Sequence, residues 1–125
     1  MPVFDPYSSA ARALGIALRT AHLGAMAVLV GGIELGAPGP SLRSWQVATF
    51  ATGAALLASE ASHSRHWVYQ GRGLATLAHV GAFFLLSFAG ANRIGVAVAL
   101  VVGALGSHLP RTVRKWSLRH GRVVD

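Results

Sequence analysis

One stretch limits the folds open to this chain more than any other feature, an apolar run from about residue 10 to residue 33. Only Arg12, Arg19, Thr20 and His22 interrupt it. At a rise of about 1.5 Å per residue, a helix of this length crosses the roughly 30 Å hydrocarbon core of a bilayer. Hydrophobic residues make up 53% of the chain and charged residues 12%, whereas soluble domains carry about 25% charged residues. The sequence therefore predicts a membrane protein.

Three further apolar segments predict helices at about residues 45–63, 74–89 and 94–108. Prolines and glycines in residues 34–44 predict a loop after the first helix, and a tight turn at residues 90–92 would join the last two helices. No internal repeat or linker divides the chain, which predicts a single domain over residues 1–125. The fold class that we expect is all-α, an integral membrane up-down four-helix bundle.

Charge predicts the orientation of the spans. Four spans place both termini on one side of the membrane, and this side carries most of the arginines, including Arg65 and Arg72 and those of residues 109–125. The positive-inside rule makes it the cytoplasmic side, so we expect a multi-pass protein of the cell inner (plasma) membrane. The basic tail, with its interleaved apolar residues, predicts an amphipathic segment along the lipid headgroups. This topology accounts for the net charge of +7 without nucleic-acid binding.

Histidine is the residue type in this chain that is best suited to bind a metal or a haem. The chain has six histidines and no cysteine, which excludes thiolate metal sites, iron–sulfur clusters and covalent c-type haem. Counted by helical rise, His22 and His79 lie within the cytoplasmic half of the hydrocarbon, where an ionisable side chain is usually functional. His63, His66 and His108 lie at its border. His120 falls outside the apolar regions.

A haem is the ligand that His22 and His79 would share. They fall on diagonal helices of the expected bundle, which are far enough apart for a porphyrin between them. Arg19 lies one helical turn from His22 and predicts a partner for a haem propionate, with Glu60 as the alternative partner within the protein. Small residues beside both histidines would make room for the macrocycle or serve close helix packing. The alternative ligands or rim residues are His63, His66 and His108.

The pattern AHLGAMAVLVGG at residues 21–32 and the passage GRGLATLAHVGAFFLLSFAGANR at residues 71–93 carry a family resemblance. With the four-span size, they resemble the membrane domains of copper-resistance D-type proteins and the small four-helix b-type cytochromes. The resemblance implies a b-type haem, or copper, held by membrane histidines, and His22 and His79 fall on the ligand-bearing helices. The pair of widely spaced histidines on one helix that serves two haems in b-type cytochromes does not occur here.

The predicted function depends on which ligand the histidines hold and on how many of them bind it. An iron with two histidine ligands suits electron transfer, with a redox partner or a quinone, whereas a single ligand would leave a position for gas sensing or for a haem-dependent oxidoreductase. The alternatives are a copper or other transition-metal binding or transport protein that uses His22, His79 and His108, and a structural membrane subunit without cofactor. Glycine-rich helix faces would serve a homodimer or internal packing. No catalytic residue is identified, because the four acids are scattered.

Overall fold

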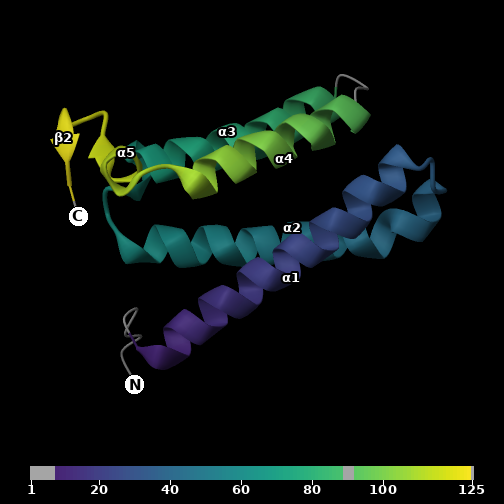
Figure 1. Ribbon diagram of the computed structural model, residues 1–125, viewed down its shortest axis with the longest axis horizontal. Coiled ribbons are helices and arrows are strands. Elements are labelled where there is room, and N and C mark those ends of the chain that lie inside the picture. The colour runs from purple at the N-terminus through teal and green to yellow at the C-terminus, as the bar shows by residue number, and fades with distance from the viewer. Residues whose placement is uncertain (1–7, 89–91, 125) are drawn as a thin grey trace. The chain divides into compact units, whose positions relative to one another are not determined.

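The computed structural model describes residues 8–88 and 92–124 (Figure 1). Over these residues the protein is all-α, apart from one 3-10 turn and two strands of two residues each. The helices and strands are α1 (Ser9–Glu34), α2 (Gly39–His63), η1 (Trp67–Tyr69), α3 (Gly71–Phe88), α4 (Asn92–His108), α5 (Arg111–Arg114), β1 (Trp116–Ser117) and β2 (Arg122–Val123). They form two compact units, residues 1–63 and 64–125, and the prediction of a single domain stays a prediction.

The first unit is a hairpin of α1 and α2. The Ser8 side chain caps α1 by accepting a hydrogen bond of 3.1 Å from the N–H of Ala11. The helix ends in a Schellman turn, in which Gly36 adopts φ +71° and the N–H of Ala37 donates to the carbonyl of Gly32 over 2.8 Å. Glycine is favoured at this position because it alone adopts positive φ without steric cost. The sequence therefore ends α1 close to the predicted residue 33.

The loop predicted at residues 34–44 is too long. Helix α2 already begins at Gly39, so Pro40 lies in its first turn. Proline is tolerated there because the first backbone N–H groups of a helix have no intrahelical partner. At its other end α2 continues to His63, as predicted, and so carries Glu60 on a regular helix.

The second unit is a hairpin of α3 and α4, with η1 packed beside α3. Helix α3 begins at Gly71, three residues before the predicted start. A Cβ at Gly71 would collide with the backbone carbonyl of Val113, and one at Gly73 with that of Trp67. These glycines thus serve close backbone packing and do not break the helix. The turn predicted at residues 90–92 lies largely outside the described residues, and α4 begins at Asn92 instead of residue 94.

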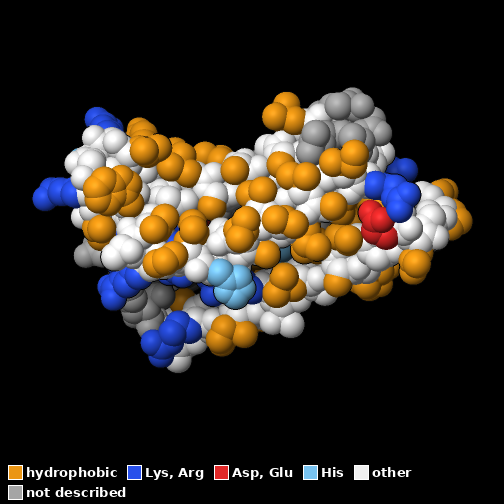
Figure 2. All heavy atoms as spheres, turned by 45° about the horizontal axis from the view of Figure 1, so that its top comes forward, with side chains coloured by type: hydrophobic (Ala, Val, Ile, Leu, Met, Phe, Trp, Pro, Cys, Tyr) orange, Lys and Arg blue, Asp and Glu red, His pale blue; other side chains and the backbone are white. Residues whose placement is uncertain are grey.

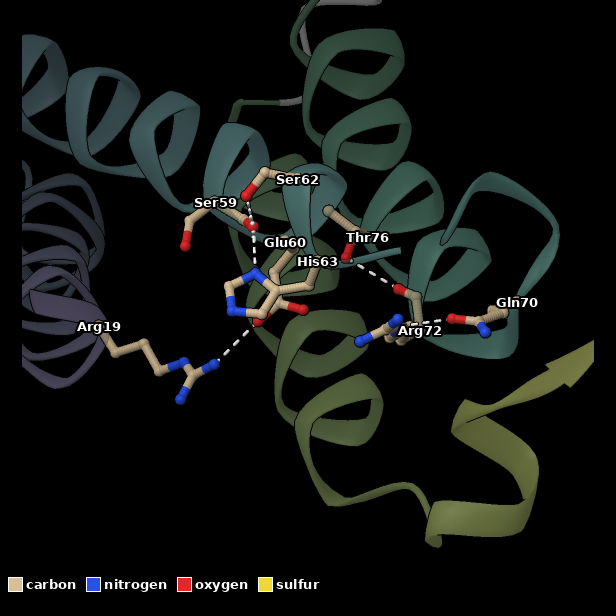
Figure 3. A network of polar contacts seen from close by, with 8 residues as sticks. All are labelled: Arg19, Ser59, Glu60, Ser62, His63, Gln70, Arg72 and Thr76. Atoms are coloured by element: carbon tan, nitrogen blue, oxygen red, sulfur yellow. Dashed lines mark hydrogen bonds and ion pairs between the residues drawn. The ribbon is translucent and has the colours of Figure 1, made fainter. Parts of the chain in front are cut away.

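The basic tail is folded onto the start of α3. Strands β1 and β2 pair antiparallel, and Ser117 also bridges to Gln70. Gln70 and Ser117 are both fully buried, and the Gln70 side-chain amide donates to the carbonyl of Val124 over 2.8 Å. Arg72 in turn donates to the Gln70 side-chain oxygen over 2.6 Å (Figure 3). Long-range contacts of this kind could not be expected from the alternation of basic and apolar residues alone.

Large apolar side chains are exposed on all four long helices. Leu14, Ile16 and Leu23 on α1 are each more than half exposed. Figure 2 shows hydrophobic side chains in greater number than charged ones on the face it draws. Among the described residues, α1 is the one helix with the length and composition to cross a membrane, and α4 is apolar but shorter.

Candidate functional site

His22 lies half-buried on α1 and faces the backbone of α2. Its Nδ1 is 3.1 Å from the carbonyl oxygen of Thr49 and 3.0 Å from the hydroxyl oxygen of Thr52. The Thr52 hydroxyl donates its only hydrogen within its own helix, to the carbonyl of Ala48 over 2.7 Å. Both partners of Nδ1 can therefore only accept, which requires the proton on Nδ1. In the neutral imidazole, this tautomer carries the lone pair on Nε2.

His79 repeats this arrangement in the second unit. It lies half-buried on α3, and its Nδ1 is hydrogen-bonded to the carbonyl oxygen of Ala99 on α4. A carbonyl oxygen accepts and cannot donate, so His79 also carries a proton on Nδ1, and the neutral ring then has its lone pair on Nε2. Both candidate ligands thus have the tautomer found in metal-bound histidines that donate their other ring N–H to a backbone carbonyl.

A glycine on the facing helix lets each ring approach. A Cβ added at Gly53 would lie 3.1 Å from Cε1 of His22, and one added at Gly103 would lie 2.8 Å from Nδ1 of His79. In both hairpins the accepting carbonyl belongs to the residue four positions before the glycine. That oxygen also accepts the intrahelical N–H of the glycine, and the missing side chain leaves its second lone pair within reach of the ring.

Arg19 and Glu60 are brought together in the first unit. Nη2 of Arg19 lies 2.8 Å from Oε1 of Glu60, and Figure 3 draws this ion pair as a dashed line. The Arg19 side chain is 62% exposed and that of Glu60 33%. Of the two partners predicted for Arg19, the structure thus contains the protein partner, and the haem propionate stays a prediction. Because Arg19 lies one turn before His22, the ion pair is on the same side of α1 as the candidate ligand.

The other candidate histidines lie apart from these rings along the chain. His63 is exposed, and its Nδ1 bonds to the carbonyl of Ser59 one turn earlier in the same helix (Figure 3). His66 packs edge-on against His120, with ring centroids 5.0 Å apart, and His120 Nδ1 lies 2.9 Å from the Ser117 hydroxyl. His108 is exposed at the last residue of α4.

Within residues 8–88 and 92–124, no group of three or more His, Asp or Glu side chains is arranged to hold a metal ion. His22 belongs to the first unit and His79 to the second, so their pairing on one ligand stays a prediction.

Sequence reasoning missed the residues that hold the two rings, Thr49 and Thr52 for His22 and the Ala99 carbonyl for His79. It also missed a short recurrence of sequence around the two histidines. The five residues around His22, AHLGA at residues 21–25, recur around His79 as AHVGA at residues 78–82. This recurrence is five residues long and does not divide the chain, so the expectation that no internal repeat divides it stays a prediction.

Comparison of this chain with family models, with curated proteins and with solved structures found no match.

Proposed function

We propose that this protein is a membrane haem b protein in which His22 and His79 supply the axial ligands. One observation carries the proposal, namely that both half-buried histidines have Nδ1 fixed as a donor to acceptors on a neighbouring helix. A structural histidine needs only some hydrogen bond, whereas a ligand needs its lone pair on a defined atom. The Nδ1–H tautomer meets the second requirement.

The proposed setting is an up-down bundle of four membrane helices with both termini in the cytoplasm. The exposed apolar side chains of all four long helices support this setting. Lipid would cover such a surface, whereas small soluble monomers rarely expose large apolar patches to water. The length of α1 supports it as well.

The residues present fit a haem in chemical type. Imidazole is an axial ligand of b-type haem, and the haem supplies a reversible one-electron change at its iron. His22 and His79 would hold that iron through Nε2, and their Nδ1–H bonds would keep each ring from rotating. Arg19 would balance a propionate. The Arg19 guanidinium is already paired with Glu60. On haem binding it would either contact both carboxylates or exchange Glu60 for the propionate.

An iron held by both histidines would suit electron transfer, since no substrate could then bind to it. The exchange partner would be a redox protein or a quinone. If only one histidine is bound, the open position suits the sensing of a small gas or oxidoreductase chemistry.

An absorption spectrum of the full chain, purified in detergent from haem-replete cells, tests the proposal. We expect a Soret band and sharp α and β bands on reduction, lost or shifted in His22→Ala and in His79→Ala. His120→Ala is the matched control, because that ring belongs to the folded tail. A colourless wild-type protein would refute the haem. Stoichiometric copper in that protein would favour a metal-binding role, and loss of the bands in His63→Ala, His66→Ala or His108→Ala would reassign the ligands.

A further inference from the structure

The two hairpins share a structural element that the ligand assignment alone does not require. In each, a histidine within the sequence Ala-His-x-Gly-Ala lies on the first helix. Its Nδ1 bonds to a carbonyl of the second helix, at Thr49 in one hairpin and at Ala99 in the other. Each carbonyl stands four residues before a glycine, Gly53 or Gly103, against which the ring lies. Sequence, hydrogen bond and glycine therefore recur together.

We infer that this recurring element is a positioning device, in which a helix carbonyl uncovered by a glycine holds a histidine as its Nδ1–H tautomer for metal ligation through Nε2. The inference rests on the proposed function and adds the residues that orient its ligands, Gly53 and Gly103 with the carbonyls of Thr49 and Ala99. The carbonyl is well suited to this task because it can only accept, so it selects one tautomer.

The glycines are needed for steric reasons. A methyl group at Gly103 would stand 2.8 Å from the very atom that donates to Ala99, and one at Gly53 would stand 3.1 Å from Cε1 of His22. Carbon atoms in favourable contact are about 3.5–4.0 Å apart. Alanine at either position would push the ring away from its carbonyl, more strongly at Gly103.

The two copies differ at the residue before the glycine. Thr52 precedes Gly53 and gives His22 a second acceptor at 3.0 Å, whereas Val102 precedes Gly103. The first copy thus orients its ring with two hydrogen bonds. A donor N–H that is more strongly bonded makes the imidazole a better electron donor to a metal, so Thr52 is a positioning residue that lowers the reduction potential of a bound haem.

Nitrogen-15 NMR of the full chain in detergent, with labelled histidine, tests the device without any haem. We expect the His22 and His79 signals, assigned through His22→Ala and His79→Ala, to show a protonated Nδ1 and an unprotonated Nε2. Gly103→Ala should shift the His79 signals toward a mixture of tautomers and leave His22 unchanged. Gly81→Ala, where a Cβ meets nothing within 4 Å, is the control and should change neither tautomer. The inference would be overturned by a neutral His79 with its proton on Nε2, or by His79 signals that are unchanged in Gly103→Ala.

Thr52→Val and Thr52→Ser test the first copy even if Gly103→Ala fails to fold. In haem-loaded protein we expect Thr52→Val to raise the midpoint potential and Thr52→Ser to restore it, because serine keeps the hydroxyl. An unchanged potential in Thr52→Val would refute the tuning role. If the tautomers are as expected but the wild type takes up no haem, the positioning device is supported and the proposed haem function fails.

Discussion

Gly103 offers the sharpest test of the packing around His79. Alanine in place of glycine inside a helix ordinarily stabilises it by about 0.5–1 kcal/mol, since glycine loses more backbone entropy on folding. At Gly103 the new methyl group would lie 2.8 Å from Nδ1 and 3.0 Å from Cε1 of His79. Overpacking of this kind costs about 1–3 kcal/mol, and a weakened hydrogen bond to Ala99 adds about 0.5–1.5 kcal/mol. We therefore expect Gly103→Ala to destabilise the protein by about 1–3 kcal/mol.

The free energy of unfolding, followed by circular dichroism in a denaturing detergent titration, measures this effect. Gly81→Ala is the matched control, because it makes the same change on α3, opposite α4, where a Cβ meets nothing within 4 Å. It should keep the stabilisation of about 0.5–1 kcal/mol that alanine gives in a helix. Gly53→Ala should fall between the two, with its closest contact at 3.1 Å. Equal stabilisation by Gly103→Ala and Gly81→Ala would show that His79 does not lie against α4 as described.

Three further substitutions probe the rest of the fold by the same measurement. Gln70→Leu should destabilise by about 1–3 kcal/mol and speed proteolysis of residues 109–125, because it removes the fully buried side-chain amide that donates to the Val124 carbonyl; exposed Gln46→Leu is the control, and equal values would refute the buried role. Gly73→Ala should cost more than about 2 kcal/mol, since its Cβ meets a backbone carbonyl that cannot move aside; a stabilised variant would contradict this. Glu60→Gln should cost less than about 1 kcal/mol, because its Arg19 partner is largely exposed; a loss of several kcal/mol would show that the pair is shielded from water.

The positions of the four long helices could be predicted because the signals are local. Apolar length marks each helix, and a serine cap and a positive-φ glycine mark the ends of α1. The predicted helix boundaries were wrong at prolines and glycines, which usually end a helix but here lie in the first turn of one. Pro40 lies in the first turn of α2, and Gly71 and Gly73 lie in the first turn of α3, where backbone carbonyls approach them closely.

The candidate site also has a part that the sequence could predict and a part that it could not. His22 and His79 stand out in the sequence because they are ionisable residues in apolar helices, and Arg19 stands out by its spacing from His22. The atoms that fix the two rings are backbone oxygens, at Thr49 and Ala99, and every residue has such an oxygen. Side-chain identity therefore carries no direct sign of them.

By itself, the sequence determined that this chain is helical, where its long helices run and which histidines lie within them, because these depend on neighbours along the chain. Only the tertiary structure decided which proton His22 and His79 carry, that Glu60 pairs with Arg19, and that Gln70 ties down the tail. Each of these depends on groups at least 20 residues apart in the chain. Such contacts form only when packing brings the segments together, and for the two histidine rings the glycines at positions 53 and 103 allow that close approach.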